Sequence, residues 1–302
     1  MLKIRTALLA LATFVVAAPA HAQLKVVTST TDLYDIAKAV GGDKITAAHI
    51  GEGFQDPHFI EAKPSFVLQM RNADVWAYVG LELEIGWMPL LLDGARNPKI
   101  NTGGTGHVDV SRVIPVLDVP SGQVDRSMGD VHPAGNPHYW LDPENGRRIA
   151  QLFAKKFSEL DAKNAAAYQA NEKAFEAKLN AAEAAWKANL ASIKGKPVVV
   201  WHTSWRYFAE YTGMKIVEYM EPKPGVPPSP AHLLEVVRAI KASGAKAIIM
   251  EPFYDRKMAD LVSRQTGAQV LIVPPSVGAA PGITDYVTLM QKDIAQVAAA
   301  VK

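Results

Sequence analysis

Residues 162–193, AKNAAAYQANEKAFEAKLNAAEAAWKANLASI, decide the fold of this 302-residue chain. The stretch is rich in Ala, Lys, Glu, Leu and Asn and contains no Gly or Pro, so it predicts one helix about 45 Å long at about 1.5 Å per residue. Asp161 is the candidate N-cap of this helix. Because such a helix exceeds the diameter of a small domain, we expect a rigid connection between two domains; a helical hairpin is the alternative.

Strands alternate with helices on both sides of this stretch. The expected strands are residues 24–29, 45–50, 75–79, 198–201, 215–220, 247–250 and 270–273. The expected helices are residues 32–40, 65–72, 83–92, 144–161, 207–211, 231–243, 256–266 and 284–301. This alternation predicts an α/β fold with two lobes, each built on a parallel sheet. We place the N-terminal lobe at residues 23–161, the linking helix at 162–194 and the C-terminal lobe at 195–302.

The first 22 residues have the features of a secretory signal peptide. Lys3 and Arg5 supply the positive start, residues 8–16 form a short apolar run, and residues 20–22 (Ala-His-Ala) give a cleavage pattern. The apolar run is shorter than the ~20 residues that a membrane-spanning helix needs. We therefore expect an exported, soluble protein without stable membrane insertion; a buried N-terminal helix is the alternative.

Charge and cysteine content exclude several kinds of site. Without Lys3 and Arg5, the 32 basic residues become 30 and balance the 30 acidic ones, so nothing indicates binding to nucleic acid or an anionic membrane. The chain has no cysteine, which excludes disulfides, thiolate metal ligands and a lipid-anchored cysteine. A soluble protein in a periplasm fits these features, and any transition-metal site must use His, Asp or Glu.

Two histidines follow matching dipeptides. Asp56-Pro57 precedes His58 at the end of one loop, and Asn136-Pro137 precedes His138 at the end of a Gly- and Pro-rich loop, residues 118–136. Proline restricts its own backbone and that of the residue before it, so each histidine is presented from a stiff loop. A metal site and two ordinary surface histidines both remain open from this spacing alone.

His202 and Glu251 each follow a buried strand of the C-terminal half. Ligands of open α/β sheets bind outside the carboxyl ends of the strands, and both residues are expected at that edge. The ordinary alternatives are a core histidine for His202 and a helix cap or ion pair for Glu251.

Several motifs together resemble the zinc/manganese/iron substrate-binding proteins of ABC importers. They are Asp-Pro-His (residues 56–58), Lys-Pro-Ser (63–65), Asn-Ala-Asp (72–74), NPHYWLDP (136–143), Trp-His-Thr (201–203) and Tyr-Phe-Ala (207–209). The resemblance implies a metal held between the lobes by His58, His138 and His202, with zinc favoured over Mn²⁺ or Fe²⁺. It also implies a monomeric binding protein, not an enzyme, that delivers metal to an inner-membrane permease with its ATPase.

The fourth ligand departs from this family pattern. The family typically has an Asp just after the last strand, where this chain has Pro275. Glu251 or a water could take its place; Asp285 is a weaker candidate. Asp130 and His132, two metal-capable residues of the 118–136 loop, could cover the site or hand over metal; simple solvated side chains are the alternative. A zinc-dependent hydrolase with Glu251 as its base is the alternative function, but the chain has no His-Glu-x-x-His motif.

Overall fold

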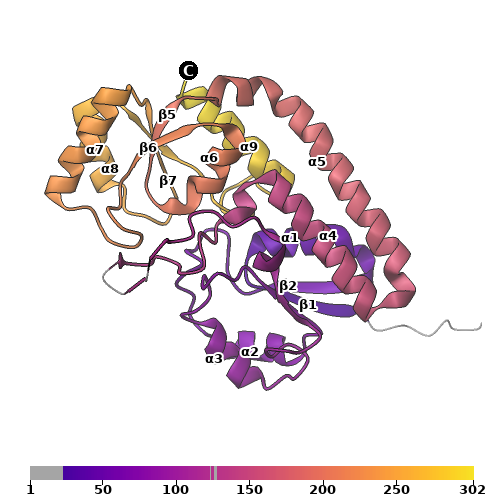
Figure 1. Ribbon diagram of the computed structural model, residues 1–302. Coiled ribbons are helices and arrows are strands. Elements are labelled where there is room, and N and C mark those ends of the chain that lie inside the picture. The colour runs from indigo at the N-terminus through magenta and orange to yellow at the C-terminus, as the bar shows by residue number, and fades with distance from the viewer. Residues whose placement is uncertain (1–22, 123, 126–127) are drawn as a thin grey trace, which may run out of the picture.

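Two four-stranded parallel sheets lie toward the two ends of one long helix (Figure 1). The computed structural model describes residues 23–302 except 123, 126 and 127, so the predicted signal peptide lies outside the described residues. The first sheet has the order β2-β1-β3-β4, with β1 Leu24–Thr28, β2 Ile45–His49, β3 Val75–Tyr78 and β4 His107–Asp109. The second has the order β6-β5-β7-β8, with β5 Pro197–Val200, β6 Lys215–Tyr219, β7 Ala247–Met250 and β8 Gln269–Ile272. The predicted α/β fold with two parallel sheets is confirmed.

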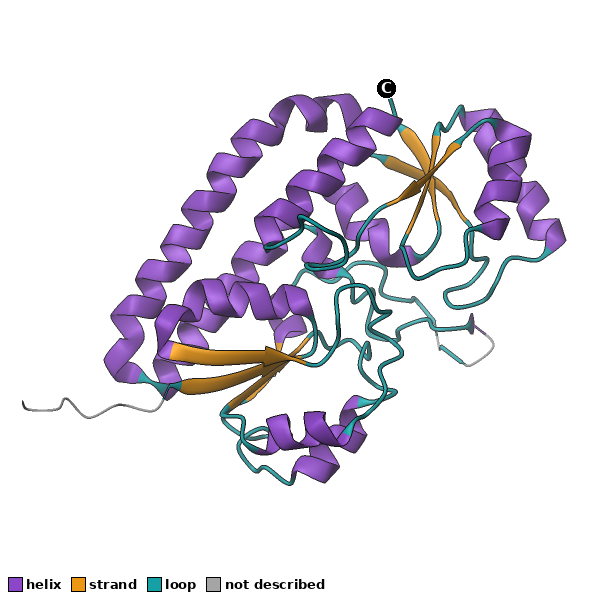
Figure 2. Cartoon of the chain, turned by 180° about the vertical axis from the view of Figure 1, so that it is seen from behind, coloured by secondary structure: helices purple, strands orange, loops and turns teal. Residues whose placement is uncertain are grey.

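Helices cover both faces of each sheet (Figures 1 and 2). They are α1 Thr31–Gly41, α2 Pro64–Arg71, α3 Met88–Ala95, α4 Pro143–Leu160, α5 Ala165–Ile193, α6 Arg206–Thr212, α7 Pro230–Ser243, α8 Lys257–Thr266 and α9 Tyr286–Ala300. Local sequence sets several of their starts. Asp142 caps α4 by accepting from the Glu144 N–H at 2.8 Å, and Pro143 follows as the first helical residue. No helix of the described chain is both long and apolar enough to cross a membrane.

The predicted long connection is confirmed as the single helix α5. Its 29 residues give a length of about 44 Å at 1.5 Å per residue, so the hairpin alternative is wrong. The predicted N-cap is also wrong, because residues 162–164 form a 3₁₀ turn and Asn164 precedes the α-helix. The Asp161 carboxylate instead accepts from the Asn164 side chain at 2.6 Å and from the Tyr168 hydroxyl at 2.8 Å.

One continuous apolar core joins the two lobes. It includes Val26 of β1, Phe153 of α4, Phe175 of α5, Val200 of β5 and Ile294 of α9, all buried. Two smaller cores lie on the outer faces, one under α2 and α3 and one under α7 and α8. Because α5 packs on α4 and α9, a wide opening of the lobes would expose apolar surface. We therefore expect small local movements rather than a wide hinge closure.

The loop before α3 differs from the sequence prediction. A helix was expected from residue 83, but α3 begins at Met88. Gly80, Leu81 and Glu82 adopt left-handed backbone angles, with φ of 81°, 54° and 67°. The buried Glu84 carboxylate fixes this turn by accepting from the Val79 and Gly80 N–H groups at 2.7 and 3.0 Å. Left-handed backbone at non-glycine residues is strained, and it delays the helix.

Candidate metal centre

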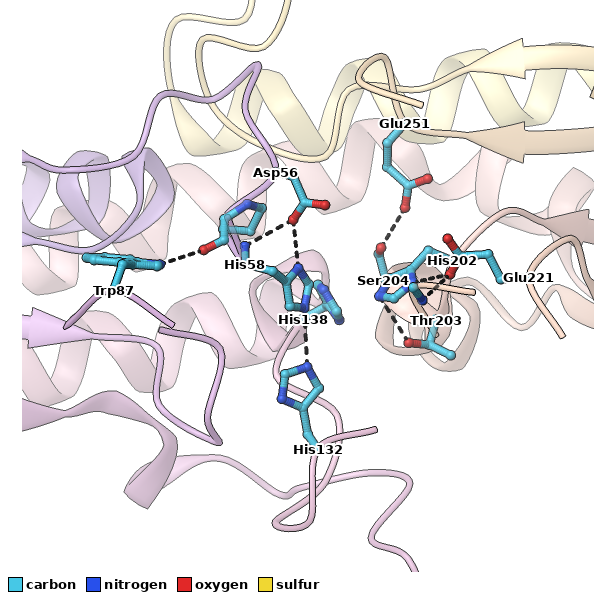
Figure 3. A network of polar contacts seen from close by, with 12 residues as sticks. Asp56, His58, Trp87, His132, His138, His202, Thr203, Ser204, Glu221 and Glu251 are labelled. Atoms are coloured by element: carbon cyan, nitrogen blue, oxygen red, sulfur yellow. Dashed lines mark hydrogen bonds and ion pairs between the residues drawn. The ribbon is translucent and has the colours of Figure 1, made fainter. Parts of the chain in front are cut away.

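Three histidines from both lobes meet between the sheets. One ring nitrogen each of His58, His138 and His202 lies within 4.8 Å of the other two, and no other such group of three His, Asp or Glu side chains occurs among the described residues. Their ring centroids are 5.2 to 5.6 Å apart. His138 and His202 are each 3% exposed. Figure 3 shows the cluster together with the carboxylates that surround it.

The repeated Asx-Pro-His sequence has a direct structural reason. The Asp56 carboxylate accepts from both the backbone N–H of His58, at 3.0 Å, and its ring Nδ1, at 2.7 Å. Asn136 Oδ1 makes the same two contacts with His138, each at 3.0 Å. In each case a side chain two residues upstream sets both the turn and the ring orientation. The Trp87 indole further holds the first loop by donating to the Pro57 carbonyl at 3.0 Å.

His202 is oriented by a residue that sequence reasoning missed. Glu221 follows β6, which neighbours β5 in the sheet, and its carboxylate accepts from His202 Nδ1 at 2.7 Å. The same carboxylate accepts from the Trp201 indole at 3.1 Å and the Gly225 N–H at 2.9 Å. The signal was present in the sequence, since an acidic residue directly after strand 215–220 must emerge at the same sheet edge as His202.

These contacts engage Nδ1 of all three rings and leave each Nε2 as the atom that could bind a metal; the Thr203 hydroxyl lies 3.4 Å from Nε2 of His202. A carboxylate or amide oxygen can only accept, so each Nδ1 carries the proton and each neutral ring has a bare Nε2. Burial, reinforced by the neighbouring histidines, holds the pKa of His138 well below its ordinary value. Burial acts to lower the pKa of His202 as well, but the Glu221 carboxylate outweighs it and the pKa is raised. Burial acts to raise the pKa of Asp56, yet the bonds from His58 hold it low.

Glu251 lies beside the cluster rather than within it. It follows β7 and is fully buried, and its Oε1 accepts from the Ser204 hydroxyl at 2.5 Å. Its Oε2 has no hydrogen-bond partner in the described part of the chain. Burial raises the pKa of Glu251 to about 7. Glu251 therefore stays a prediction as the fourth ligand. Its carboxylate lies close to the three histidines and accepts a hydrogen bond from Ser204.

The other fourth-ligand candidates have different surroundings. The Pro275 carbonyl accepts from the Trp140 indole at 2.8 Å. Asp285 caps α9 by accepting from the Thr288 N–H at 2.8 Å, and it pairs with Lys178 at 2.9 Å, so its carboxylate is engaged elsewhere. His132, in contrast, brings its Nε2 to 3.2 Å from the Nε2 of His58.

A pocket of about 390 Å³ adjoins the histidines. Its wall includes His58, His202, Glu221, Asp130 and Tyr254, so it joins the metal-capable nitrogens to the surface between the lobes. The Asp130 N–H donates to the Pro224 carbonyl of the C-terminal lobe at 2.8 Å. The 118–136 loop thus contacts both lobes beside the cluster.

Comparison with known proteins shows the family to which the chain belongs. Residues 26–300 match the sequence model of the family described as zinc-uptake complex component A, periplasmic. The chain belongs to this family. The iron ABC transporter substrate-binding lipoprotein MtsA of Streptococcus pyogenes is 31% identical over 82% of this chain and 78% of its own length. The zinc-binding lipoprotein AdcA of Streptococcus pneumoniae is 26% identical over 91% of this chain and 55% of its own length.

A third relative and two solved structures extend the comparison. The high-affinity zinc uptake protein ZnuA of Brucella abortus is 34% identical over 46% of this chain and 41% of its own length. A crystal structure of ZnuA matches 93% of this chain and 100% of that chain, with a TM-score of 0.76 at 22% identity. A manganese-bound periplasmic protein from Candidatus Liberibacter asiaticus covers the same shares, with a TM-score of 0.77 at 21% identity. At these identities the two structures show the shared fold.

Proposed function

We propose that this protein captures a divalent transition metal, zinc first, and delivers it to an ABC importer. The observation that carries the proposal is the convergence of His58, His138 and His202 from two lobes, each with its Nδ1 engaged by an oxygen. Oxygen acceptors behind the histidines are the usual support of a zinc site, because they fix ring orientation and raise ligand basicity.

The donor set supports zinc over manganese. Imidazole suits zinc, whereas manganese favours carboxylate, carbonyl and water oxygens. Three imidazoles here converge without a carboxylate among them. A manganese- or iron-binding role is the second candidate, because the relative MtsA is named for iron and one solved neighbour holds manganese.

Metal capture explains the geometry better than hydrolysis does. A catalytic zinc normally has its ligands on a rigid scaffold and keeps an open position for water. Here His58 and His138 come from loops of the first lobe and His202 follows β5 of the second, so the site depends on how the lobes meet. An interlobe site suits a cargo that must later be released.

The proposal includes partners and location. Delivery would be to an inner-membrane permease with its ATPase, neither of which is encoded in this chain. We propose that the mature protein is a soluble periplasmic monomer. The periplasmic description of the matched family supports the compartment.

The test is a metal titration of chelator-stripped protein by calorimetry with zinc, manganese and iron(II). We expect the tightest binding for zinc and a large loss in His202→Ala, since that variant removes the ligand from the second lobe. His232→Ala is the matched control, because that histidine bonds Glu235 and the Tyr219 carbonyl, away from the cluster. Wild-type affinity in His202→Ala would overturn the three-histidine site.

A further inference from the structure

We propose that His132 is a fourth imidazole ligand of the metal, an inference that rests on the metal-binding function proposed above. His132 belongs to the 118–136 loop of the first lobe, and its Nε2 lies 3.2 Å from the Nε2 of His58. Figure 3 shows the two rings facing each other beside His138. The proposal fills the coordination position for which Pro275 offers no side-chain ligand.

The contact between the two nitrogens needs an explanation. His58 Nδ1 donates to the Asp56 carboxylate, so the neutral ring has a bare Nε2. The main chain of Leu81 forms a hydrogen bond with the His132 ring, which engages that ring as a donor. In the His132 tautomer that carries its proton on Nδ1, the two Nε2 lone pairs point at each other, an unfavourable arrangement unless a cation lies between them; in the other tautomer His132 Nε2–H donates to His58 Nε2.

A zinc ion fits the observed spacing. Zinc bonds imidazole nitrogen at about 2.0–2.1 Å in tetrahedral sites, which separates two ligand nitrogens by about 3.3 Å. The Nε2 atoms of His58 and His132 are 3.2 Å apart. His132 is not within 4.8 Å of all three other ligand nitrogens, so we expect its ring to shift toward His138 and His202 when the metal binds.

The strained turn before α3 has a role in this arrangement. Leu81 has a φ of 54°, and the Glu84 carboxylate holds the turn through Val79 and Gly80. Strained backbone at a non-glycine residue often marks a functional site. The turn brings the Leu81 main chain to the His132 ring. The side-chain oxygens of Asp56, Asn136 and Glu221 accept from the rings of the other three histidines in a similar way. Every histidine of the proposed set thus has an outer oxygen partner, as ligating histidines usually do.

The ring contacts of His132 support the same reading. Its ring contacts those of His58 and His138, with centroids 5.3 and 6.5 Å apart. His132 and Glu251 both lie outside the group of three ligand atoms, but Glu251 Oε1 is engaged by the Ser204 hydroxyl at 2.5 Å, whereas His132 Nε2 faces His58 Nε2 at 3.2 Å. The geometry therefore favours a four-imidazole zinc site over one completed by this carboxylate.

X-ray absorption of the zinc-loaded wild-type protein tests the proposal directly, because multiple scattering counts the bound imidazoles. We expect four imidazoles in wild type and three plus one oxygen in His132→Ala. Competition with a chelator should show zinc binding in His132→Ala weakened by at least the roughly 10- to 100-fold that loss of an outer partner costs, because the variant removes a ligand itself. His232→Ala should keep four imidazoles and wild-type affinity.

The outcomes separate this inference from the proposed function. Tight zinc binding by three imidazoles in wild type, unchanged in His132→Ala, would overturn the role of His132 and leave the proposed function standing. Loss of an oxygen from the shell in Glu251→Gln would assign the position to that carboxylate and equally overturn His132. A wild-type protein that binds no zinc would refute the proposed function itself. The count on wild type needs no variant, so misfolding of a mutant cannot obscure it.

Discussion

Glu221→Gln should weaken zinc binding by about 10- to 100-fold, because the substitution removes the charged acceptor behind His202. In the native protein one carboxylate oxygen accepts from both His202 Nδ1 and the Gly225 N–H, and the other accepts from the Trp201 indole. All three groups donate, and Glu221 is 7% exposed, so little water can replace a lost bond.

The magnitude follows from these contacts. Glutamine offers one oxygen and one NH₂ group, so whichever way the amide turns, a donor faces a donor. A buried group left unsatisfied costs about 1–3 kcal/mol, and the 10- to 100-fold range of affinity corresponds to about 1.4–2.7 kcal/mol. If the amide oxygen faces the indole, His202 loses its acceptor and its Nε2 is no longer aimed at the metal.

The assay is chelator competition with zinc, paired with urea unfolding of the metal-free protein. Unfolding separates a general loss of stability from a loss of affinity. Glu218→Gln is the matched control, since Glu218 lies on β6, the strand that Glu221 follows, and its carboxylate accepts from the adjacent Tyr219 N–H at 2.9 Å. Zinc affinity within twofold of wild type in Glu221→Gln would refute the reasoning that this carboxylate orients the ligand.

Three further predictions concern protonation and the outer oxygens. Zinc affinity, measured by competition as the pH is lowered from 8.5 to 5.5, should start to decrease before the pH reaches 6.5. The reason is the raised pKa of His202, which lets that ring take up a proton at a higher pH than an ordinary histidine; a flat profile would contradict this. Asp293→Asn should unfold at higher urea than wild type at pH 8 but not at pH 4. The Asp293 carboxyl is fully buried and its pKa is strongly raised in the folded protein. The free energy of unfolding of the wild type therefore decreases by up to about 1.4 kcal/mol per pH unit as the pH rises above the pKa of this group in the unfolded chain. An equal dependence of the free energy of unfolding on pH in wild type and Asp293→Asn would refute this. Asp56→Asn should keep most zinc affinity, as Asn136 already performs the same role for His138, whereas Asp56→Ala should lose about tenfold; equal losses would show that the charge, not the acceptor, matters.

Much of the fold was predictable because local and global signals agree. The absence of Gly and Pro from residues 162–193 predicts α5, and alternating apolar runs predict seven of the eight strands. The eighth, β4, has only three residues, His107–Asp109, and follows a Gly- and Thr-rich segment, so its pairing with β3 depends on the sheet rather than on its own sequence. The left-handed turn at residues 80–82 depends on the carboxylate of Glu84, four to five residues from the N–H groups that it accepts from, and the helix-like sequence of this stretch does not reveal that contact.

The candidate site was predictable to a different degree. Position after a strand and the Asx-Pro-His repeat both direct attention to His58, His138 and His202, and the structure brings their nitrogens together. The roles of Glu221 and His132 depend on contacts across 19 and 74 residues of sequence. Local propensity carries no information about such contacts, although the edge rule for parallel sheets would have found Glu221.

The arrangement of charge around the histidines explains how such a site can both bind and release a metal. The negative charges of Asp56 and Glu221 lie behind imidazole rings rather than in the cluster of ligand atoms. In the proposed site they would stabilise a divalent ion through the rings, without supplying the oxygen ligands that would favour manganese. Because the rings themselves are neutral, the ion leaves no unpaired buried ligand charge when it departs, and loss of one lobe's histidine is enough to open the shell. A site of directly bound carboxylates would bury unpaired negative charge in the empty state.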